Sequence, residues 1–326
     1  MRSAAITAVG AYLPERKLTN ADLEKLVDTS DAWIIERTGI RERRILGKGK
    51  GSAYMAIRAA QQALERRGMP AQEIDLIIVA TVTPEHPFPA TANIVANAIG
   101  AKRAWGFDTE AACSSFLYAL SVAADIIVAG RVERALIIGS DKMSSIIDYR
   151  DRATCVIFGD GAGAVLLEPT EEPVGVMDYL HQADGSGCVH LHMKAGGSVL
   201  PPSVRTVRNR LHYVYQEGRQ VFKHAVVQMA SVAEQLMRKH GLRPEDIAYF
   251  VPHQANLRII EAAAQRLGLP MEKVMVNIDR YGNTTSATLP LCLYDYESRL
   301  KRGDNLILAS FGGGFTWGAL WLRWAY

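Results

Sequence analysis

The chain is poor in cysteine, and its 326 residues contain only four. Cys113, Cys155, Cys188 and Cys292 form no CxxC pair and show no spacing typical of metal ligands. The four cysteines therefore do not resemble a disulfide framework, and we expect a reducing compartment.

Long hydrophobic runs and a strong excess of charge are also missing. No apolar run approaches the roughly 18 residues that a membrane span requires. The weakly apolar start soon meets Gly10 and Pro14, unlike a signal peptide. We therefore expect a cytoplasmic protein that does not bind a membrane. The net charge of +3 gives no indication of a general nucleic-acid binder.

Basic residues are nevertheless concentrated in two runs. They comprise Arg37, Arg41, Arg43, Arg44, Lys48 and Lys50 in the first run, and Arg205, Arg208, Arg210 and Arg219 in the second. Such runs are often solvated faces, and they also suit a phosphorylated or acidic partner. The sequence leaves the role of the arginine-rich segment 189–210 open.

The chain does contain alternating strand-length apolar runs and helical patterns. Asp75–Val82 and Val274–Ile278 have the length and composition of strands. Helical periodicity covers Ser52–Arg67 and Gly218–Lys239, and a glycine follows each within two residues. This alternation predicts right-handed βαβ units and an α/β fold, whereas residues 171–215 look irregular.

Phe158–Glu168 contains the glycine-rich sequence Phe-Gly-Asp-Gly-Ala-Gly. A nucleotide-binding loop of this kind leads into a helix N-terminus. Here the following residues, Ala162–Leu167, are strand-like instead. We predict a glycine turn between two strands and no dinucleotide site.

The second half of the chain repeats the first. Ile74 and Cys113 are 39 positions apart, and so are Ile247 and Ser286. A strand, a helix start and a glycine turn recur in the same order, which favours duplication over two α/β halves that are alike by chance.

We therefore predict two pseudo-symmetric halves, residues 1–170 and residues 171–326. If they pack face to face, equivalent positions meet at their junction. The helix start at Cys113 would then lie close to Asn283 and to His253, which follows a strand.

Cys113 is the candidate nucleophile. Backbone N–H groups at a helix start, together with the helix dipole, favour a thiolate over a thiol. A buried structural cysteine is the alternative, since cysteine is common in protein cores. A histidine at the end of a strand, such as His253, is likewise often structural, and the expected convergence of these residues is what favours catalysis.

Together these residues resemble the β-ketoacyl-acyl carrier protein synthase III family of the thiolase-like superfamily, nearly from end to end. The resemblance rests on Cys113 and on the blocks Thr29–Trp33, Arg37–Arg41, Phe158–Gly163, Gly218–Lys223, Val251–Arg258, Gly282–Thr284 and Phe311–Trp317. It implies a thiolase-like α/β fold whose two βαβ-rich halves pack as five layers, αβαβα. Asn283 distinguishes this chain from elongating synthases, which use Cys-His-His, and from thiolases, which use Cys-His-Cys.

The resemblance implies a decarboxylative condensation that initiates fatty-acid synthesis. Cys113 would accept an acyl group from acyl-CoA, and malonyl-acyl carrier protein (malonyl-ACP) would then lose CO2. His253 and Asn283 would donate hydrogen bonds to the resulting enolate, and the backbone N–H groups of Cys113 and Gly313 would form the oxyanion hole. The products would be a β-ketoacyl-ACP, CoA and CO2, with no metal or cofactor.

The resemblance also implies binding residues. The CoA contacts would be Thr29, Trp33, Arg37, Arg152, Gly218, Phe222 and Asn256. Arg258 and Gln254 would contact the acidic carrier protein, and Phe88 and Phe311 would line the acyl pocket. Phe88 would close the pocket of a partner subunit, which implies a homodimer. Primer length and branching stay open, because no motif defines the pocket wall.

Three other functions compete with this one. A related Cys-His-Asn enzyme of polyketide or secondary-metabolite synthesis would take malonyl-CoA or another acyl donor directly. A thiol hydrolase would release its acyl group to water, although the duplication and the glycine turns disfavour it. A non-catalytic scaffold is disfavoured because all three polar groups are present.

Overall fold

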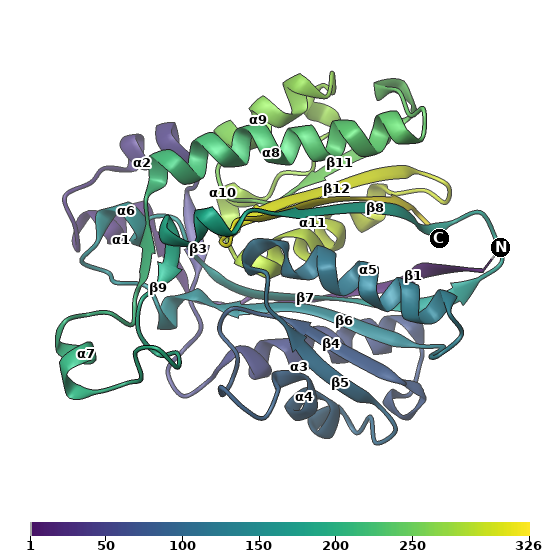
Figure 1. Cartoon of the computed structure of the whole chain (residues 1–326), viewed down its shortest axis with the longest axis horizontal. Coiled ribbons are helices and arrows are strands. Elements are labelled where there is room, and N and C mark those ends of the chain that lie inside the picture. The colour runs from purple at the N-terminus through teal and green to yellow at the C-terminus, as the bar shows by residue number, and fades with distance from the viewer. Residues whose placement is uncertain (1) are drawn as a thin grey trace.

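Two mixed sheets form the centre of the fold in a computed structural model that describes residues 2–326 (Figure 1). The first sheet has the order β1 (Ser3–Tyr12), β7 (Asp160–Thr170), β6 (Ala135–Lys142), β4 (Leu76–Ala80) and β5 (Trp105–Thr109). The second has the order β11 (Tyr249–Pro252), β12 (Asn305–Gly312), β13 (Thr316–Arg323) and β8 (Gly175–Ala183). In each sheet, parallel pairs carry the βαβ units and antiparallel pairs complete one edge.

Three helical layers enclose these sheets. One pair of helices covers the outer face of the first sheet, one pair lies between the sheets, and one pair covers the outer face of the second (Figure 1). In that order they are α3 (Ser52–Arg67) and α4 (Thr91–Ile99), α5 (Ser115–Val128) and α11 (Thr288–Tyr296), and α8 (Gly218–Lys239) and α9 (Leu257–Arg266). The predicted αβαβα arrangement is confirmed.

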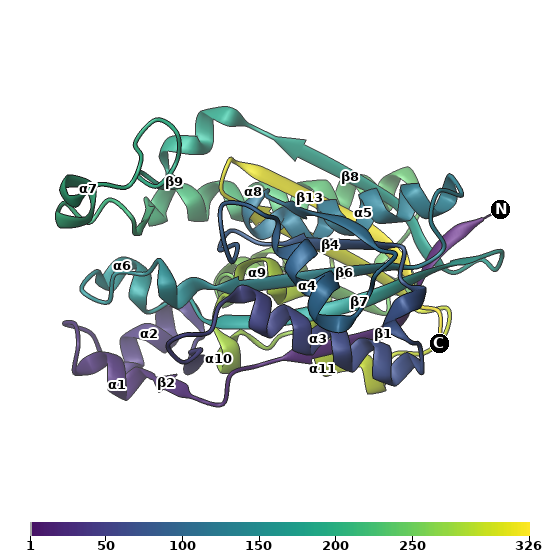
Figure 2. The ribbon, with the colours of Figure 1, turned by 90° about the horizontal axis from the view of Figure 1, so that it is seen from below.

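Most of the remaining elements gather at the end of the molecule that lies away from the chain termini (Figures 1 and 2). They are the strand pairs β2 (Lys17–Thr19) with β3 (Glu42–Arg44) and β9 (Leu191–Met193) with β10 (Val214–Gln216), and the helices α1 (Asn20–Glu24), α2 (Asp31–Thr38), α6 (Arg152–Cys155), α7 (Val204–Arg208) and α10 (Ile278–Tyr281). They frame the site described below.

Local sequence signals explain several element boundaries. The Ser30 side chain accepts a hydrogen bond from the Trp33 backbone N–H and so starts α2, which ends at Gly39 with φ 79°. Helix α3 likewise ends at Gly68 with φ 66°. The boundaries predicted for α3 and α8 agree with the structure.

Three local predictions are wrong. The segment predicted as irregular contains β8, which pairs antiparallel with β13. Val274–Ile278 is not a strand, because only Val274 makes a bridge, to Phe250. The glycines after Phe158 lie within or next to β7 rather than in a turn, and they admit close neighbours: a Cβ on Gly163 would lie 2.8 Å from the Cβ of Pro290 on α11.

The repeat predicted from the sequence is visible in the backbone. The 3₁₀ helices Ala112–Ser114 and Thr285–Ala287 precede α5 and α11, and they lie against each other. Each begins with a non-glycine residue at positive φ, 48° at Ala112 and 55° at Thr285. Cys113 and Ser286 therefore occupy equivalent places at the junction. The division between residues 170 and 171 stays a prediction.

No helix within residues 2–326 is both long and apolar enough to cross a membrane.

Candidate active site

Cys113 lies in a tight turn between β5 and α5. Ala111 N–H donates to Ser115 Oγ at 2.6 Å, so the turn is closed from within. The second half of the chain also holds it, because Ser310 Oγ donates to the Cys113 carbonyl at 2.7 Å and Thr316 Oγ1 donates to the Ala111 carbonyl at 2.8 Å. The thiol is thus fixed at the junction of the two halves.

The Cys113 thiol does not ionise easily in this place. Burial raises its pKa, and the negative charge of Asp141 raises it further, while the Cys113 backbone N–H acts in the opposite direction. The expectation that the helix start makes this cysteine a thiolate is wrong, because burial outweighs the helix start. A reaction at this sulfur would therefore require a neighbouring group that accepts the thiol proton.

His253 follows β11, and its backbone N–H donates to the Ala309 carbonyl at 2.8 Å. Burial lowers the pKa of its side chain to about 3, so the imidazole is neutral at pH 7. Nδ1 lies 2.7 Å from Thr288 Oγ1, and Nε2 has no hydrogen-bond partner within residues 2–326.

Asn283 is held by its backbone and by its side-chain oxygen. Its N–H donates to the Ile157 carbonyl at 2.9 Å, and its carbonyl accepts from Gly159 N–H at 3.0 Å. Oδ1 accepts from Thr285 N–H at 2.8 Å. The amide NH2 is therefore the part of the side chain left to donate to a ligand.

Cys113, His253 and Asn283 border the same cavity, which has a volume of about 550 Å³. The predicted residues Trp33, Arg37, Gly218, Phe222, Asn256, Arg258 and Phe311 also line it. Gly312 lies against the nucleophile, and a Cβ there would be 2.6 Å from the Cys113 nitrogen. Glycine is therefore required at this position.

Flat and cationic groups stand beside this cavity. The guanidinium carbon of Arg152 lies 5.2 Å from the centre of the Trp33 ring, and that of Arg37 lies 5.9 Å from the same ring. Arg152 also donates to the carbonyl of Asp28, next to Thr29. Asn256 has a structural task as well, because its side chain caps α9 and donates to the Arg37 carbonyl at 2.8 Å.

Some arginines of the two basic runs line the cavity, and another does not. Arg210 pairs with Asp148 instead, at 2.6 Å. Arg37, Arg219 and Arg258 are exposed and line the cavity. Arg258 also stacks on a cavity wall residue, with its guanidinium carbon 5.4 Å from the centre of the Phe222 ring.

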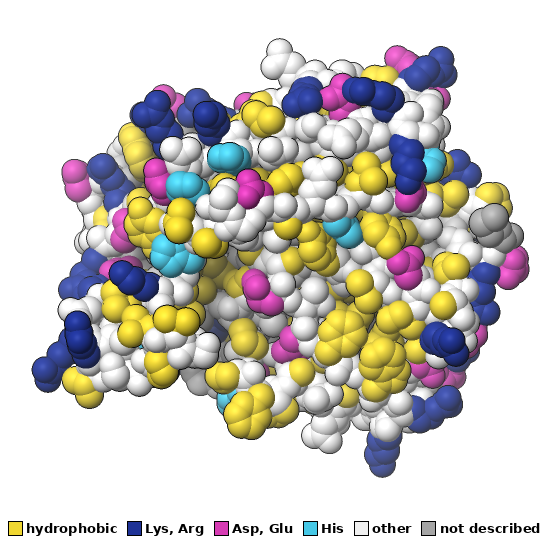
Figure 3. Space-filling view, viewed as in Figure 1, with side chains coloured by type: hydrophobic (Ala, Val, Ile, Leu, Met, Phe, Trp, Pro, Cys, Tyr) yellow, Lys and Arg dark blue, Asp and Glu magenta, His cyan; other side chains and the backbone are white. Residues whose placement is uncertain are grey.

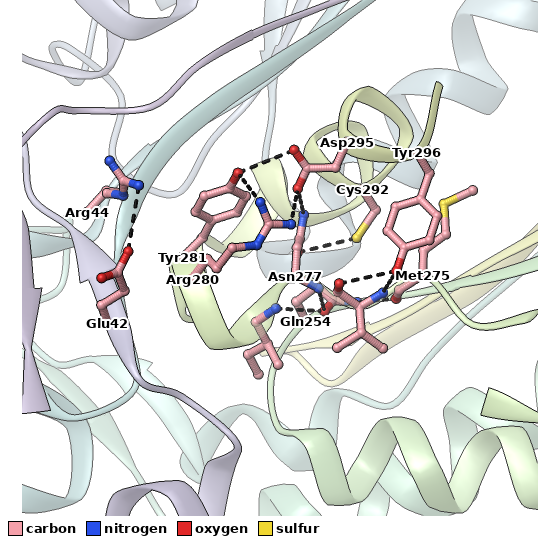
Figure 4. A network of polar contacts seen from close by, with 12 residues as sticks. Glu42, Arg44, Gln254, Met275, Asn277, Arg280, Tyr281, Cys292, Asp295 and Tyr296 are labelled. Carbon is pink, nitrogen blue, oxygen red and sulfur yellow. Dashed lines mark hydrogen bonds and ion pairs between the residues drawn. The ribbon is translucent and has the colours of Figure 1, made fainter. Parts of the chain in front are cut away.

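Gln254 is not a surface residue, so its predicted contact with a carrier protein is wrong. It is fully buried, and its Nε2 donates to the carbonyls of Pro252 at 2.8 Å and Met275 at 3.0 Å. Its Oε1 accepts from the backbone N–H groups of Asn277 and Ile278. Figure 4 shows Gln254 within this network, which ties the end of β11 to the start of α10.

A second cavity, of about 360 Å³, meets the first at Cys113. Its apolar walls come from separate segments, namely Val82, Met143, Ile146, Phe158, Leu191, Met193 and Val214. Gly313 borders it, but Phe311 lines the first cavity and not this one. Phe88 is 85% exposed and borders neither cavity.

Sequence reasoning missed most of these wall residues. Leu191 and Met193 belong to β9 and Val214 to β10, inside or beside the segment whose role was left open. Only Phe158 carried a signal, as the start of the glycine-rich motif. An apolar residue in a short, irregular segment does not reveal which cavity it faces.

Ser286, the counterpart of Cys113, is bound on both sides. Its backbone N–H donates to the Asp141 carboxylate at 3.0 Å, and its hydroxyl lies within hydrogen-bond distance of both that carboxylate and the Ala80 carbonyl. Asp141 is fully buried and also accepts from Thr81 and Thr83. The second helix start is therefore structural.

The family models and the curated relatives agree with each other. Residues 107–185 match the family described as 3-oxoacyl-[acyl-carrier-protein (ACP)] synthase III, and residues 237–324 match the C-terminal part of the same family. The chain is 58% identical to the β-ketoacyl-[acyl-carrier-protein] synthase III of Porphyromonas gingivalis, over 99% of this chain and 97% of that protein. It is 54% identical to synthase III 2 of Bacteroides thetaiotaomicron, with the same coverage.

A solved structure agrees with these relatives. The crystal structure of 3-oxoacyl-[acyl-carrier-protein] synthase III from Aquifex aeolicus superposes with a TM-score of 0.91 at 44% identity, covering 98% of this chain and all of that one.

Proposed function

The chain belongs to the 3-oxoacyl-[acyl-carrier-protein] synthase III family, and from this premise we propose how its residues carry out the condensation that initiates fatty-acid synthesis. The observation that carries the proposal is a single cavity bordered by Cys113, His253 and Asn283. A thiol, an imidazole and an amide are suited to acyl transfer followed by stabilisation of an enolate.

The first half-reaction loads the enzyme. The Cys113 sulfur attacks the thioester carbon of an acyl-CoA, a bond forms from Sγ to that carbon, and the bond to the CoA sulfur breaks. The backbone N–H groups of Cys113 and Gly313 stabilise the oxyanion. The acyl chain then rests in the second cavity, and CoA leaves through the first.

The second half-reaction extends the acyl group. Malonyl-ACP loses CO2, and the electrons of the broken carbon–carbon bond form an enolate. An N–H of His253 and the amide of Asn283 donate to its oxygen. The enolate carbon attacks the acyl-Cys113 carbonyl, the β-ketoacyl-ACP is released, and the thiol is regenerated.

CoA binds along the first cavity in this proposal. The adenine stacks between the Trp33 indole and the Arg152 guanidinium, which lies 5.2 Å from the ring centre in this structure and has to swing outward to admit the base. Arg37 is placed to meet a phosphate, and Thr29, Gly218, Phe222 and Asn256 follow the remaining path.

The acidic carrier protein docks where that cavity opens. Arg258 is the main contact, supported by Arg37 and Arg219, because all three are exposed and line the cavity. Clustered positive charge steers an acidic partner toward the opening.

We further propose a homodimer joined through β5. This strand is an edge of the first sheet, and Trp105 on it is 51% exposed and stacks on Phe107. Hydrophobic side chains gather over β5 at the lower right of Figure 3. An open apolar edge needs a cover, and a second copy would also give the exposed Phe88 a pocket to fill.

The cysteines support a reducing, cytoplasmic location. All four cysteines are free in the structure, and no two of them form a CxxC motif in the sequence.

Intact-mass measurement tests the loading step. The protein is incubated with a panel of acyl-CoAs and digested, and we expect one acyl group on the Cys113 peptide. Its mass identifies the primer, and the absence of any adduct across the panel would overturn the proposal.

The extension step is tested with malonyl-ACP and malonyl-CoA supplied separately. Preference for malonyl-ACP is expected from the arginines at the cavity, whereas preference for malonyl-CoA would indicate the related condensing enzymes. Release of free acid without a β-keto product would indicate a thiol hydrolase instead.

A further inference from the structure

The two ring nitrogens of His253 differ sharply in their surroundings. Nδ1 faces the hydroxyl of Thr288, whose oxygen lies 2.7 Å away. Nε2 is buried without a partner within residues 2–326, and the residue borders the cavity that contains Cys113. Whichever nitrogen carries the proton of the neutral ring decides whether His253 offers Nε2 as an acceptor or as a donor.

Thr288 has one hydroxyl proton and two neighbouring groups that could accept it. Its Oγ1 lies 3.0 Å from the carbonyl of Thr285, three residues earlier. A threonine hydroxyl near a helix start commonly donates to such a carbonyl. With its proton used there, Oγ1 can only accept from His253, so Nδ1 carries the ring proton. Thr288 is only 1% exposed, so bulk water does not share this bond.

We propose that Thr288 is a positioning residue that holds His253 as the Nδ1–H tautomer, so that Nε2 takes the Cys113 thiol proton and keeps it for the second half-reaction. This deepens the proposed function and rests on it. His253 then acts in both halves of the cycle through the same nitrogen, first as an acceptor and then as a donor.

The protons balance in this scheme. When Sγ bonds to the acyl carbon, its proton moves to Nε2, CoA departs as a thiolate and takes a proton from water. The imidazolium donates from Nε2 to the thioester oxygen of malonyl-ACP while CO2 leaves. When the enolate displaces Sγ from the acyl group, the thiolate recovers the proton from Nε2. One proton is taken from water per cycle, as the loss of CO2 from a carboxylate requires.

The surroundings of both groups support this sequence. Burial raises the pKa of the Cys113 thiol, so the thiol needs an acceptor at the moment of attack. The imidazolium that forms is stabilised by Thr288 Oγ1, which accepts from Nδ1–H throughout. The ring need not turn or exchange tautomers between the two half-reactions.

Nitrogen NMR of the resting enzyme tests the tautomer directly. The protein is labelled with ¹⁵N-histidine, and the His253 signals are identified by their loss in His253→Asn. We expect the protonated-nitrogen shift at Nδ1 and the unprotonated shift at Nε2. The reverse pattern overturns the proposal, and this reading needs no substrate.

Half-reaction kinetics of Thr288→Val and Thr288→Ser test the consequence. Thr288→Val keeps the shape but removes the acceptor, and we expect the rate of Cys113 acylation to fall by about 100-fold, the low end for general acid–base catalysis. Decarboxylation of malonyl-ACP by enzyme that has been fully acylated beforehand should persist, because the ring can then hold its proton at Nε2. Thr288→Ser should restore acylation.

Ser121→Ala provides a matched control. Ser121 Oγ likewise donates to a carbonyl three residues earlier, that of Tyr118, and lies 2.8 Å from a ring nitrogen of the partly buried His181. It borders neither cavity, so its loss should leave both half-reactions unchanged.

The other outcomes are distinguishable. Loss of decarboxylation with normal acylation means that Thr288 donates to Nδ1, which overturns the proposal. Unchanged rates in Thr288→Val, or equal losses in both half-reactions, overturn it too. If the wild-type enzyme is not acylated by any acyl-CoA, the proposed function itself fails, while the tautomer is still decided by NMR.

Discussion

Cys113 combines a nucleophile's position with a thiol that resists ionisation. Burial and the Asp141 charge act against the thiolate, and the helix start does not compensate. An isolated buried cysteine of this kind would be inert. In the proposed mechanism its reactivity comes from His253 and from the oxyanion donors, so the site would require both halves of the chain.

Replacement of the nucleophile gives the simplest prediction. Cys113→Ala should abolish acylation at this site by any acyl-CoA, because Cys113 is the cysteine that borders both cavities, whereas Cys188 borders the second alone. Peptide mapping by mass spectrometry checks this, with the exposed Cys188 as an internal control. An acyl group that persists on another cysteine of the variant would contradict the assignment.

Replacement of Asn283 should affect the second half-reaction and leave the first intact. Asn283→Asp keeps an oxygen for Thr285 N–H but removes the NH2 donor. We expect acylation to continue and decarboxylation to slow by about 10²–10³, as for loss of one oxyanion donor. Single-turnover assays of each half-reaction measure this.

Asn283→Ala is the companion variant, because it removes the donor together with the bond to Thr285. It should slow decarboxylation at least as much. A variant that decarboxylates normally but cannot be acylated would reverse the assigned role.

For individual residues, the sequence predicts those that belong to short motifs and misses those whose role depends only on packing. Cys113, His253 and Asn283 were found because their neighbours form recognisable blocks. Thr288 on α11 and Asp141 on β6 were missed, because the sequence next to each residue does not indicate which side chain it contacts. The prediction for Gln254 failed for the opposite reason. This residue belongs to the recognisable motif Val251–Arg258, but its side chain is buried in the core.

The strands and helices follow from sequence where the local pattern and the packing agree. Helices α3 and α8 were predicted to the residue, because amphipathic periodicity and glycine ends coincide. Strand β8 was missed because its residues are only partly buried and lack an apolar run. Val274–Ile278 has strand composition, but only Val274 pairs with a neighbour.

Close contact between β7 and α11 leads to a prediction about stability. Gly163→Ala should lower the free energy of unfolding by about 1–3 kcal/mol, because its Cβ would press on the ring of Pro290. Urea unfolding measures the loss. Gly47→Ala is the control, since nothing lies within 4 Å of a Cβ there. Equal stability of the two variants would contradict the tight packing.

Considered as a whole, the molecule should lose stability on mild acidification. Burial lowers the pKa of His253 to about 3 and that of His181 to about 4, against about 6.5 in the unfolded chain. Below pH 6.5 the unfolded chain therefore binds protons that the folded chain does not. The stabilisation is complete above pH 6.5 and declines as the pH falls toward each folded pKa.

His181→Gln tests this without touching the site. For His181 the full loss is at most about 3 kcal/mol. Urea midpoints at pH 7.5 and pH 4.5 should differ less in the variant than in the wild type. Equal differences in the two proteins would show that His181 does not contribute.

The proposed dimer is also a property of the whole molecule. Trp105→Asp places a charge on the open edge of β5 and should shift the mass measured by light scattering from dimer to monomer. Leu26→Asp is the control, because Leu26 is 53% exposed and follows α1, which lies at the other end of the molecule from β5 (Figure 1). A wild-type monomer, or a variant that stays dimeric, would contradict this interface.

Asp141 and Gly312 show how two equivalent strand positions contact the two helix starts in different ways. Asp141 on β6 and Gly312 on β12 occupy equivalent strand positions in the two halves. Val79 pairs with Ile138 in the first sheet as Pro252 pairs with Ala309 in the second. Asp141 and Gly312 each lie three residues after the second member of these pairs. In one half the aspartate side chain binds the helix start at Ser286, and in the other the missing side chain of Gly312 lets the backbone of Cys113 approach closely. The same strand position therefore serves as a side-chain anchor for Ser286 in one half and as a close backbone contact for Cys113 in the other.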